Sequence, residues 1–292
     1  MIGSAPVLTD PDFIRKLETL HLLARKVLGG MLRADRRSEK KGAGILFADH
    51  AEYSLGDDYR AIDWHIFGRL GELMIRLYEL EEDTSIHLLV DLSRSMRTKS
   101  LYARQLAASL GYIALANADR LAVWGLADAL RPIVEPTHGK GRVLAMLRAL
   151  EGAECFGADT RLSACARSFR LRTRRRGVCV ILSDFFMGDW EEGLRLLRHA
   201  RHEVFCLQVI DPDEQRCDWR GDVELECVET GRRRRLTIGP SEAAAFARAV
   251  QDWNERLRRH CARNEIGFAR AGIDVPFEQV IGKILRQGGL VA

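Results

Sequence analysis

Hydroxyl and carboxylate side chains follow directly after one apolar segment of the chain. Residues 86–90 read Ile-His-Leu-Leu-Val and lead into Asp91, the first residue of the sequence Asp-Leu-Ser-Arg-Ser. The alternate spacing of Asp91, Ser93 and Ser95 allows a tight turn after a strand to aim all three side chains inward. Oxygen ligands of this kind suit Mg²⁺ or Mn²⁺. Taken alone, however, either serine would also serve as the cap of a following helix, a role that contributes about 1 kcal/mol.

Two further oxygen-bearing segments occur later, in the order that a shared site requires. Residues 178–182 form a second apolar segment, and Ser183 and Asp184 follow it. Between the two segments, a short loop offers the hydroxyl of Thr160 just before an expected helix. In an open parallel sheet, ligands bind at the carboxyl ends of the strands. The combination therefore favours a metal site over an isolated helix cap.

The segments that must position these residues alternate between strands and helices. Apolar runs predict strands at residues 86–90, 121–126, 130–135, 178–182 and 204–210, and helical periodicity predicts helices at residues 100–117, 140–150, 161–172, 189–200 and 241–261. A final strand and helix are expected at about residues 265–285. This alternation predicts an α/β fold with a doubly wound, mainly parallel sheet and helices on both faces.

A β-hairpin insertion is expected to interrupt the alternation at about residues 219–239. Residues 222–229 alternate at a period of two, and Thr230-Gly231 provides a turn before the run Arg232–Arg235. A period of two is typical of a strand with one exposed face. We expect these arginines to pair with glutamates of the opposite strand rather than to bind phosphate.

The first 83 residues are expected to form an extension of their own. Helical spacing predicts a helix at residues 11–28, interrupted by Gly29-Gly30, and short strands and turns are predicted at residues 44–85. We therefore divide the chain into an N-terminal helix with a short-strand region, residues 1–83, and an α/β domain, residues 84–292.

Composition restricts the classes of protein to which the chain can belong. It has 292 residues, of which 47% are hydrophobic and 29% charged, as in folded globular proteins. Its seven cysteines form no C-x-x-C pair, so buried thiols are expected rather than disulfides or a zinc site. No signal peptide and no membrane-spanning segment are recognised, and the cytoplasm is the expected location.

Two other binding modes receive less support from the sequence. The net charge of +4 is small, and specific nucleic-acid binding is not expected from the arginine runs at residues 172–176 and 232–235. His199 and His202 lie three residues apart on an expected helix, where they would be able to share a metal ion. Because no third ligand lies nearby in the sequence, we expect both histidines on the surface.

The metal-site pattern resembles the metal-ion-dependent adhesion site of von Willebrand factor A domains. In those domains, the D-x-S-x-S side chains, a threonine from a loop and an aspartate at a later strand end surround one metal ion. The resemblance implies that Mg²⁺, or alternatively Mn²⁺ or Ca²⁺, is the cofactor here. The five matching positions are Asp91, Ser93, Ser95, Thr160 and Asp184.

An upstream segment resembles a more specific signature. Residues 56–64 read Gly-Asp-Asp-Tyr-Arg-Ala-Ile-Asp-Trp, which is similar to the G-D-D-x-R-x-I-D-W signature of bacterial proteins in domain-of-unknown-function family 58. In that family the signature precedes D-x-S-x-S at about this distance. The resemblance implies an adaptor that works with a MoxR-type AAA+ ATPase. The signature residues in this chain are Gly56, Asp57, Asp58, Arg60, Asp63 and Trp64.

The signature itself allows two interpretations. Arg60 and Asp63 would form an ion pair in a structural junction between the N-terminal strands and the α/β domain, which we favour. Alternatively, Asp57, Asp58 and Asp63 would ligate a second metal ion.

Two classes of function remain open. A bound Mg²⁺ with a free coordination position would accept a carboxylate from a partner protein, so the chain would be an interaction module and not an enzyme. The alternative is a Mg²⁺-dependent hydrolase or phosphatase with Asp91 as its nucleophile. Phosphatases of that kind carry a second aspartate two residues later, where this chain has Ser93. The chain also lacks a G-x-x-x-x-G-K-[S/T] loop, so it is not expected to hydrolyse ATP.

Overall fold

The computed structural model describes residues 8–35, 39–41, 46–54, 57–79, 84–157, 159–173, 175–227 and 231–286. The chain divides into two compact units. One contains the residues up to Ala24 together with those from Thr84 onward, and the other contains residues 25–83. Residues 8–24 thus group with the α/β unit, whereas the sequence had placed them in the N-terminal extension.

A six-stranded sheet forms the centre of the larger unit. Its order is β11-β8-β7-β4-β5-β6, and β6 is the one strand that runs antiparallel to its neighbour. Counted along the chain, this is the 3-2-1-4-5-6 order of doubly wound folds, which reverses between β4 and β7. The strands are β4 (Ser85–Asp91), β5 (Arg120–Leu126), β6 (Arg131–His138), β7 (Val178–Ser183), β8 (Glu203–Ile210) and β11 (Gly267–Gly272).

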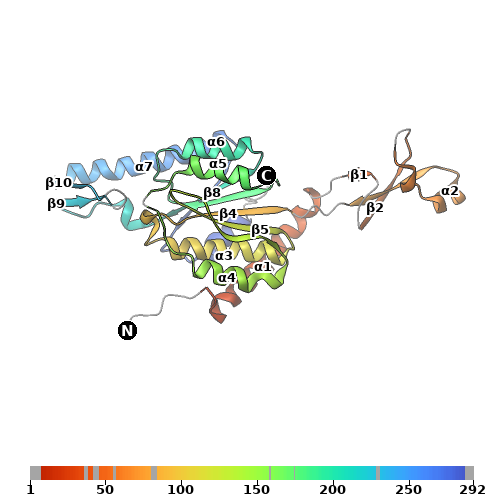
Figure 1. Cartoon of the computed structure of the whole chain (residues 1–292), viewed down its shortest axis with the longest axis horizontal. Coiled ribbons are helices and arrows are strands. Elements are labelled where there is room, and N and C mark those ends of the chain that lie inside the picture. The colour runs from red at the N-terminus through yellow and green to blue at the C-terminus, as the bar shows by residue number, and fades with distance from the viewer. Residues whose placement is uncertain are drawn as a thin grey trace. The chain divides into compact units, whose positions relative to one another are not determined.

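Helices cover both faces of this sheet (Figure 1). One layer contains α5 (Leu162–Arg172), α6 (Trp190–His199) and α7 (Pro240–Arg263). The opposite layer contains α3 (Ser100–Ala116) and α4 (Val143–Glu151), and α8 (Phe277–Arg286) packs against α3. The predicted fold class, a doubly wound and mainly parallel α/β fold, is confirmed. None of the described helices is long and apolar enough to cross a membrane.

The core follows from the strand sequences. Parallel strands that are covered on both faces need continuous apolar runs, and Leu89, Ile181 and Cys206 are accordingly buried beneath α5, α6 and α7. On α1 (Pro11–Asp35), side chains at helical spacing are buried, and the Phe13 ring lies 5.1 Å from that of Phe277 in α8. All seven cysteines are free thiols, and four of them are buried, namely Cys165, Cys179, Cys206 and Cys261.

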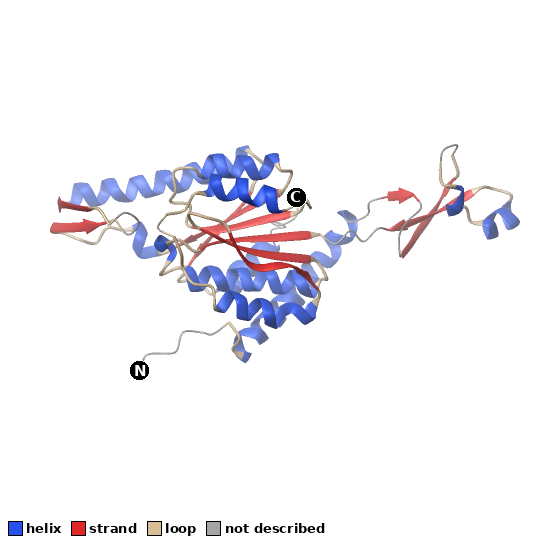
Figure 2. Cartoon of the chain, in the orientation of Figure 1, coloured by secondary structure: helices blue, strands red, loops and turns tan. Residues whose placement is uncertain are grey.

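The predicted hairpin insertion is present, as Figure 2 shows by its two short strands beside the start of α7. Strands β9 (Gly221–Glu226) and β10 (Arg233–Ile238) pair in antiparallel fashion. The Arg233 guanidinium lies 2.9 Å from the Glu226 carboxylate, and that of Arg235 lies 3.1 Å from Glu224. The predicted pairing of arginines with glutamates across the strands is confirmed.

The smaller unit is built on a three-stranded antiparallel sheet in the order β1-β3-β2. Its elements are β1 (Glu39–Lys41), β2 (Leu46–Glu52), the short helices η1 (Tyr59–Ala61) and α2 (Trp64–Leu70), and β3 (Met74–Glu79). Helix α2 was not predicted. Nor does α1 stop at Gly29-Gly30, because a glycine inside a helix costs only about 1 kcal/mol.

Candidate metal centre

Asp91 and Asp184 lie at the carboxyl ends of two adjacent parallel strands. Asp91 ends β4, and Asp184 follows β7 by one residue. The pairing of Val90 with Leu182 brings the two strand ends side by side. Both aspartates are buried, with 1% and 3% of their surface exposed. The two carboxylates thus meet at the point where the strand order reverses, the usual ligand site of such a sheet.

Hydroxyl groups from distant parts of the chain donate hydrogen bonds to the Asp91 carboxylate. Thr160 Oγ1 donates to Asp91 Oδ1 at 3.0 Å, and Ser183 Oγ donates to Asp91 Oδ2 at 2.6 Å. The main-chain N–H of Ser93 also donates to Asp91 Oδ1, at 3.0 Å. Three of the expected ligand residues are therefore in direct contact, with Ser183 beside them.

The two serines of the Asp-Leu-Ser-Arg-Ser segment face each other and do not cap helices. Their hydroxyls lie 3.0 Å apart. Ser93 precedes the short helix η2 (Arg94–Met96), but its side chain makes no capping hydrogen bond there. The residue that precedes α3 is Lys99, not Ser95. Both hydroxyls are thus left for a role other than helix capping.

A backbone constraint holds the Thr160 loop against the end of β5. Gly157 has a positive φ of 73°, and a Cβ there would lie 2.9 Å from the Cβ of Ala127. The main-chain N–H of Arg161 donates to the carbonyl of Ala127 at 3.1 Å. Glycine permits both the left-handed conformation and this close approach. The loop therefore delivers the Thr160 hydroxyl to the edge of the sheet.

Asp184 contacts a buried lysine. Its Oδ2 accepts a hydrogen bond of 2.8 Å from Lys99 Nζ, and its Oδ1 accepts one of 3.0 Å from the N–H of Phe186. Lys99 Nζ also lies 2.5 Å from the Glu214 carboxylate. The next residue, Phe185, has a left-handed φ of 60°, a conformation that costs a non-glycine residue about 1 kcal/mol or more. The turn after β7 thus carries some backbone strain.

A series of hydrogen bonds links Asp184 to α7. Gln208 Nε2 donates to the main-chain oxygen of Asp184 at 3.3 Å and to Asn254 Oδ1 at 2.7 Å. Trp253 Nε1 donates to the carbonyl of Phe185 at 3.2 Å. Two neighbouring residues of α7 are therefore bonded, directly or through Gln208, to the turn that carries Asp184.

Burial and charge perturb the acid–base properties of the cluster. Burial, followed by the nearby negative charge of Asp184, raises the pKa of Asp91 to about 6. Burial alone would lower the pKa of Lys99, but its pairing with Asp184 and Glu214 raises that pKa above its ordinary value. Burial also raises the pKa of Glu214, which its bond to Lys99 opposes. At this edge of the sheet, the carboxylates of Asp91, Asp184 and Glu214 thus lie around a single buried cation, Lys99.

The donor atoms fit a hard divalent cation. Asp91, Ser93, Ser95, Thr160 and Asp184 offer only oxygen atoms, which suit Mg²⁺, Mn²⁺ or Ca²⁺. A divalent ion would balance the excess negative charge of the buried carboxylates. Within the described residues, no cluster of three His, Cys, Asp or Glu side chains is placed to bind a metal ion. A zinc site of that composition is thus not found among the described residues, and the candidate site relies on hydroxyl groups as well as carboxylates.

Comparison with known proteins identifies the family. The model of a family described as "protein of unknown function DUF58" matches residues 49–256. The chain belongs to the DUF58 family. An uncharacterized protein of Mycobacterium tuberculosis, Rv1480, is 30% identical to this DUF58 chain over 250 residues, which cover 82% of the chain and 78% of the relative. A shorter stretch of 90 residues is 38% identical to an uncharacterized protein of Mycobacterium avium and covers 30% of the chain and 53% of that protein.

Solved structures that resemble the DUF58 chain include von Willebrand factor A proteins. One is a von Willebrand factor type A protein from Catenulispora acidiphila, with a TM-score of 0.40, 12% identity, and coverage of 73% of this chain and 43% of that one. Another is proximal thread matrix protein 1 of the mussel byssus with a zinc-occupied MIDAS motif, with a TM-score of 0.34, 17% identity, and coverage of 43% and 35%.

The DUF58 signature residues serve local structure in the smaller unit. Asp58 accepts a hydrogen bond from the N–H of Arg60, and Asp63 accepts from the N–H groups of His65 and Ile66 at the start of α2. Asp63 Oδ2 also lies 3.2 Å from Nε2 of His50. The expected ion pair between Arg60 and Asp63 is not formed, because these contacts occupy Asp63.

The remaining signature residues lie in different settings. Asp57 Oδ2 accepts from the N–H of Ser54 at 3.0 Å. Arg60 lies with its guanidinium 5.9 Å from the centre of the Tyr59 ring, and Trp64 is 61% exposed. Gly56 lies outside the described residues.

Two residues at the centre were missed by sequence reasoning. Neither Lys99 nor Glu214 is among the site residues that the sequence predicts. A signal for Glu214 exists, because Asp211, Asp213 and Glu214 follow the end of β8, a third strand whose carboxyl end lies at the same edge. The acidic run after that strand would have placed Glu214 near the site.

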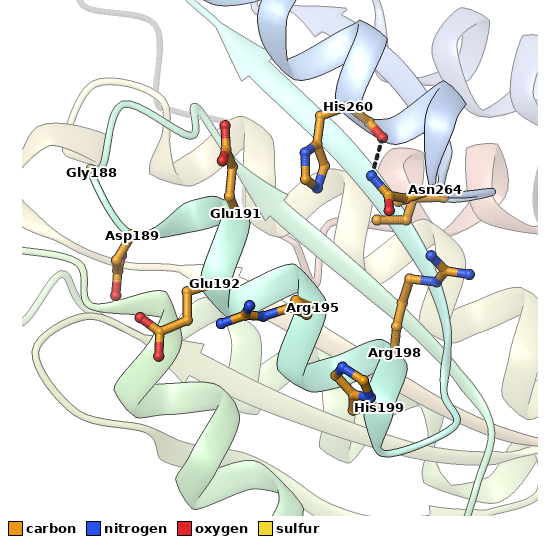
Figure 3. A pocket seen from close by; sticks show the side chains of 10 residues that line it. Gly188, Asp189, Glu191, Glu192, Arg195, Arg198, His199, His260 and Asn264 are labelled. Carbon is orange, nitrogen blue, oxygen red and sulfur yellow. Dashed lines mark hydrogen bonds between the residues drawn. The ribbon is translucent and has the colours of Figure 1, made fainter.

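The predicted surface position of His202 is wrong. Its ring is buried and lies 5.5 Å from that of His87, and its Nδ1 is 3.3 Å from the carbonyl oxygen of Gly177. His199 instead lines a separate hollow of about 850 Å³ between α6 and the end of α7 (Figure 3). The two glutamates of that hollow pair with arginines, Glu191 with Arg256 and Glu192 with Arg167. The two histidines therefore share no metal site.

Proposed function

We propose that this DUF58 chain is a metal-dependent protein-interaction module. In this proposal Mg²⁺, or alternatively Mn²⁺ or Ca²⁺, binds between Asp91, Ser93, Ser95, Thr160 and Asp184 and leaves one coordination position for a carboxylate of a partner protein. The observation that carries the proposal is the meeting of two buried carboxylates at the reversal of the strand order, with three hydroxyl-bearing side chains around them.

The environment of Asp91 argues for binding rather than for catalysis. Only 1% of the residue is exposed, and both of its carboxylate oxygens already accept hydrogen bonds. A nucleophile must reach an external substrate directly, which the burial of this carboxylate disfavours, whereas a metal ligand has only to face an ion held within the protein. We therefore assign Asp91 to metal binding, and the alternative of a Mg²⁺-dependent phosphatase receives no support from its contacts.

The partner that we propose is a MoxR-type AAA+ ATPase. The resemblance of residues 56–64 to the family signature led us to expect such an ATPase, and membership of the chain in the DUF58 family is consistent with that expectation. A metal-bound carboxylate of the ATPase would give the complex a dependence on divalent cations. The module would act as an adaptor and would leave ATP hydrolysis to its partner.

Calorimetry with Mg²⁺ tests the metal site. We expect the wild-type chain to bind Mg²⁺ and the Asp91→Asn and Asp184→Asn variants to lose that binding, because each removes a charged ligand. Asp252→Asn is the matched control, since Asp252 is an exposed residue of α7 outside the metal centre. Unchanged affinity in both ligand variants would overturn the site.

Co-purification tests the partner separately. The chain is mixed with a MoxR-type AAA+ ATPase, in Mg²⁺ and in EDTA, and the Asp184→Asn variant is compared. We expect a complex only with Mg²⁺ and wild-type chain. If the complex forms equally well in EDTA and with Asp184→Asn, the metal has no role in partner binding. In a separate assay, turnover of a phosphate ester that is lost in Asp91→Asn would favour the phosphatase.

A further inference from the structure

A cavity of about 390 Å³ opens beside the candidate metal centre. Two of the proposed ligand residues, Ser95 and Asp184, belong to its lining, together with Lys99 and Glu214. The rest of the lining is apolar and consists of Phe186, Phe246, Ala249, Val250 and Trp253. Any group that reaches the metal ion from this side therefore has an apolar surface next to it.

One face of α7 supplies most of this apolar lining. Phe246, Ala249, Val250 and Trp253 are spaced so that they form a single stripe along the helix. Such a stripe normally faces the core, yet 43% of Phe246 is exposed. At the other end of the stripe, the Trp253 indole donates a hydrogen bond to the carbonyl of Phe185, the residue after Asp184. We call the cavity bounded by Phe186, Phe246, Val250 and Trp253 the α7 groove.

A second cavity, of about 960 Å³, continues from the α7 groove toward the hairpin. It shares Phe246 and Glu214 with the groove. Its apolar wall includes Leu225 and Leu236 of the hairpin strands and Trp219, which is 60% exposed. Two cavities in series, with an aromatic side chain between them, suit an elongated ligand better than a compact one.

The charges of the α7 groove select among ligand classes. Among its described lining residues, Lys99 is the one cation, and Asp184 and Glu214 already pair with it. A nucleic acid needs several exposed cations to neutralise its phosphates, and the groove does not provide them. A single carboxylate directed to the metal ion, with uncharged side chains beside it, complements both the charge and the apolar lining.

We propose that the α7 groove binds a segment of a partner protein in which an acidic residue, which completes the metal centre, is flanked by large apolar side chains. The inference rests on the proposed function and specifies which partner segments the same site would select. The acid occupies the free position on the metal ion, one apolar side chain fills the α7 groove, and a second reaches the cavity at Trp219 and Leu236.

A peptide library tests this inference with the full chain. Phage-displayed peptides of random sequence with one fixed aspartate are selected on the chain in Mg²⁺. We expect enrichment of Leu, Ile, Phe or Trp near the aspartate. The enriched peptide should bind about tenfold or more weakly to Phe246→Ser in fluorescence anisotropy, because the variant removes the large apolar side chain against which the peptide packs.

Leu144→Ser is the matched control. Leu144 lies on α4, and 45% of it is exposed, almost the same as Phe246. We expect its peptide affinity to equal that of the wild type. Equal affinity of the Phe246→Ser and Leu144→Ser variants, or enriched peptides without apolar residues, would overturn the inference.

Two further measurements separate the inference from the proposed function. If Mg²⁺ binds in calorimetry but the selected peptides carry no apolar preference, the metal centre stands and the α7 groove is refuted. If Mg²⁺ does not bind, the proposed function fails first. A second copy of this chain is the other occupant to test, by sedimentation. If the wild type is a dimer and Phe246→Ser is a monomer, the groove binds a second copy and the proposal is overturned.

Discussion

Lys99 Nζ lies 2.8 Å from Asp184 Oδ2, and 1% and 4% of the two side chains are exposed. The ammonium group occupies the side of Asp184 that faces Glu214, so it neutralises a buried carboxylate in the absence of a metal ion. The same positive charge would repel a divalent cation bound at Asp184. We therefore expect the lysine to stabilise the metal-free protein and to compete with a metal ion.

The Lys99→Met variant tests both effects of this lysine. Loss of one partner of a buried ion pair costs about 3 kcal/mol, so we expect a lower melting temperature in EDTA. Because the competing charge is gone, Mg²⁺ should raise the melting temperature more than it does for the wild type. Lys140→Met, at an exposed position, should change neither value. A Mg²⁺ effect no larger than that of the wild type would contradict the competition.

The buried His87 ring predicts a loss of stability in acid. Burial, with a smaller contribution from His202, lowers the pKa of His87 to about 4. The unfolded chain binds this proton near pH 6.5 and the folded chain only near pH 4, so the unfolded chain holds more protons between these values. Stability is thus full above pH 6.5 and falls as the pH drops toward 4, by at most about 1.4 kcal/mol per pH unit.

Urea unfolding at pH 7 and pH 5 measures this effect. The difference in unfolding free energy between the two pH values should shrink in His87→Leu. His138→Gln changes an exposed histidine and should leave the difference as it is in the wild type. An undiminished difference in His87→Leu would assign the acid sensitivity to other groups.

Gly177 sits where no side chain fits. A Cβ at this position would lie 1.9 Å from the main-chain oxygen of Ser85, so Gly177→Ala forces β4 and the start of β7 apart. We expect a loss of about 3 kcal/mol in the free energy of unfolding. Gly141→Ala is the control, because nothing lies within 4 Å of a Cβ there. If the two variants unfold at the same urea concentration, the close approach is not a constraint.

Asp63 allows a test of the signature in the smaller unit. Asp63→Ala removes the cap of α2 and the contact with His50, which we expect to cost about 1–2 kcal/mol locally. Hydrogen exchange should accelerate in residues 64–70 and stay unchanged in the α/β unit. Glu72→Ala, an exposed change in the same unit, is the control. If Asp63→Ala instead lost bound Mg²⁺ while hydrogen exchange in residues 64–70 stayed unchanged, the second-metal interpretation would be favoured.

The sequence was most informative where one local pattern decides the outcome. The apolar runs that lead to Asp91 and Asp184 predicted β4 and β7, because buried parallel strands need such runs. The period of two predicted the hairpin, and opposite charges predicted its cross-strand pairs. The chain order of Asp91, Thr160 and Asp184 was enough to expect them together, and the hydrogen bond between Thr160 and Asp91 agrees with that expectation.

Features that depend on tertiary packing were not accessible in this way. Helix α2 is short and exposed, so no apolar periodicity marks it. The bond of Lys99 to Glu214 joins residues 115 positions apart, which only the final packing brings together. His202 was misplaced because its polar side chain reads as a surface residue, although it packs in the core against Phe169. The α7 groove likewise results from a helix stripe that the fold leaves partly uncovered.

The amide of Gln208 connects the proposed metal centre with the α7 groove. It joins the main chain of Asp184 to Asn254, next to Trp253 in the wall of the α7 groove. If this bond transmits a shift between them, reciprocity requires that the factor by which a cation tightens peptide binding equals the factor by which the peptide tightens cation binding. Cation retention would then report whether the partner is bound, and release of either ligand would promote release of the other.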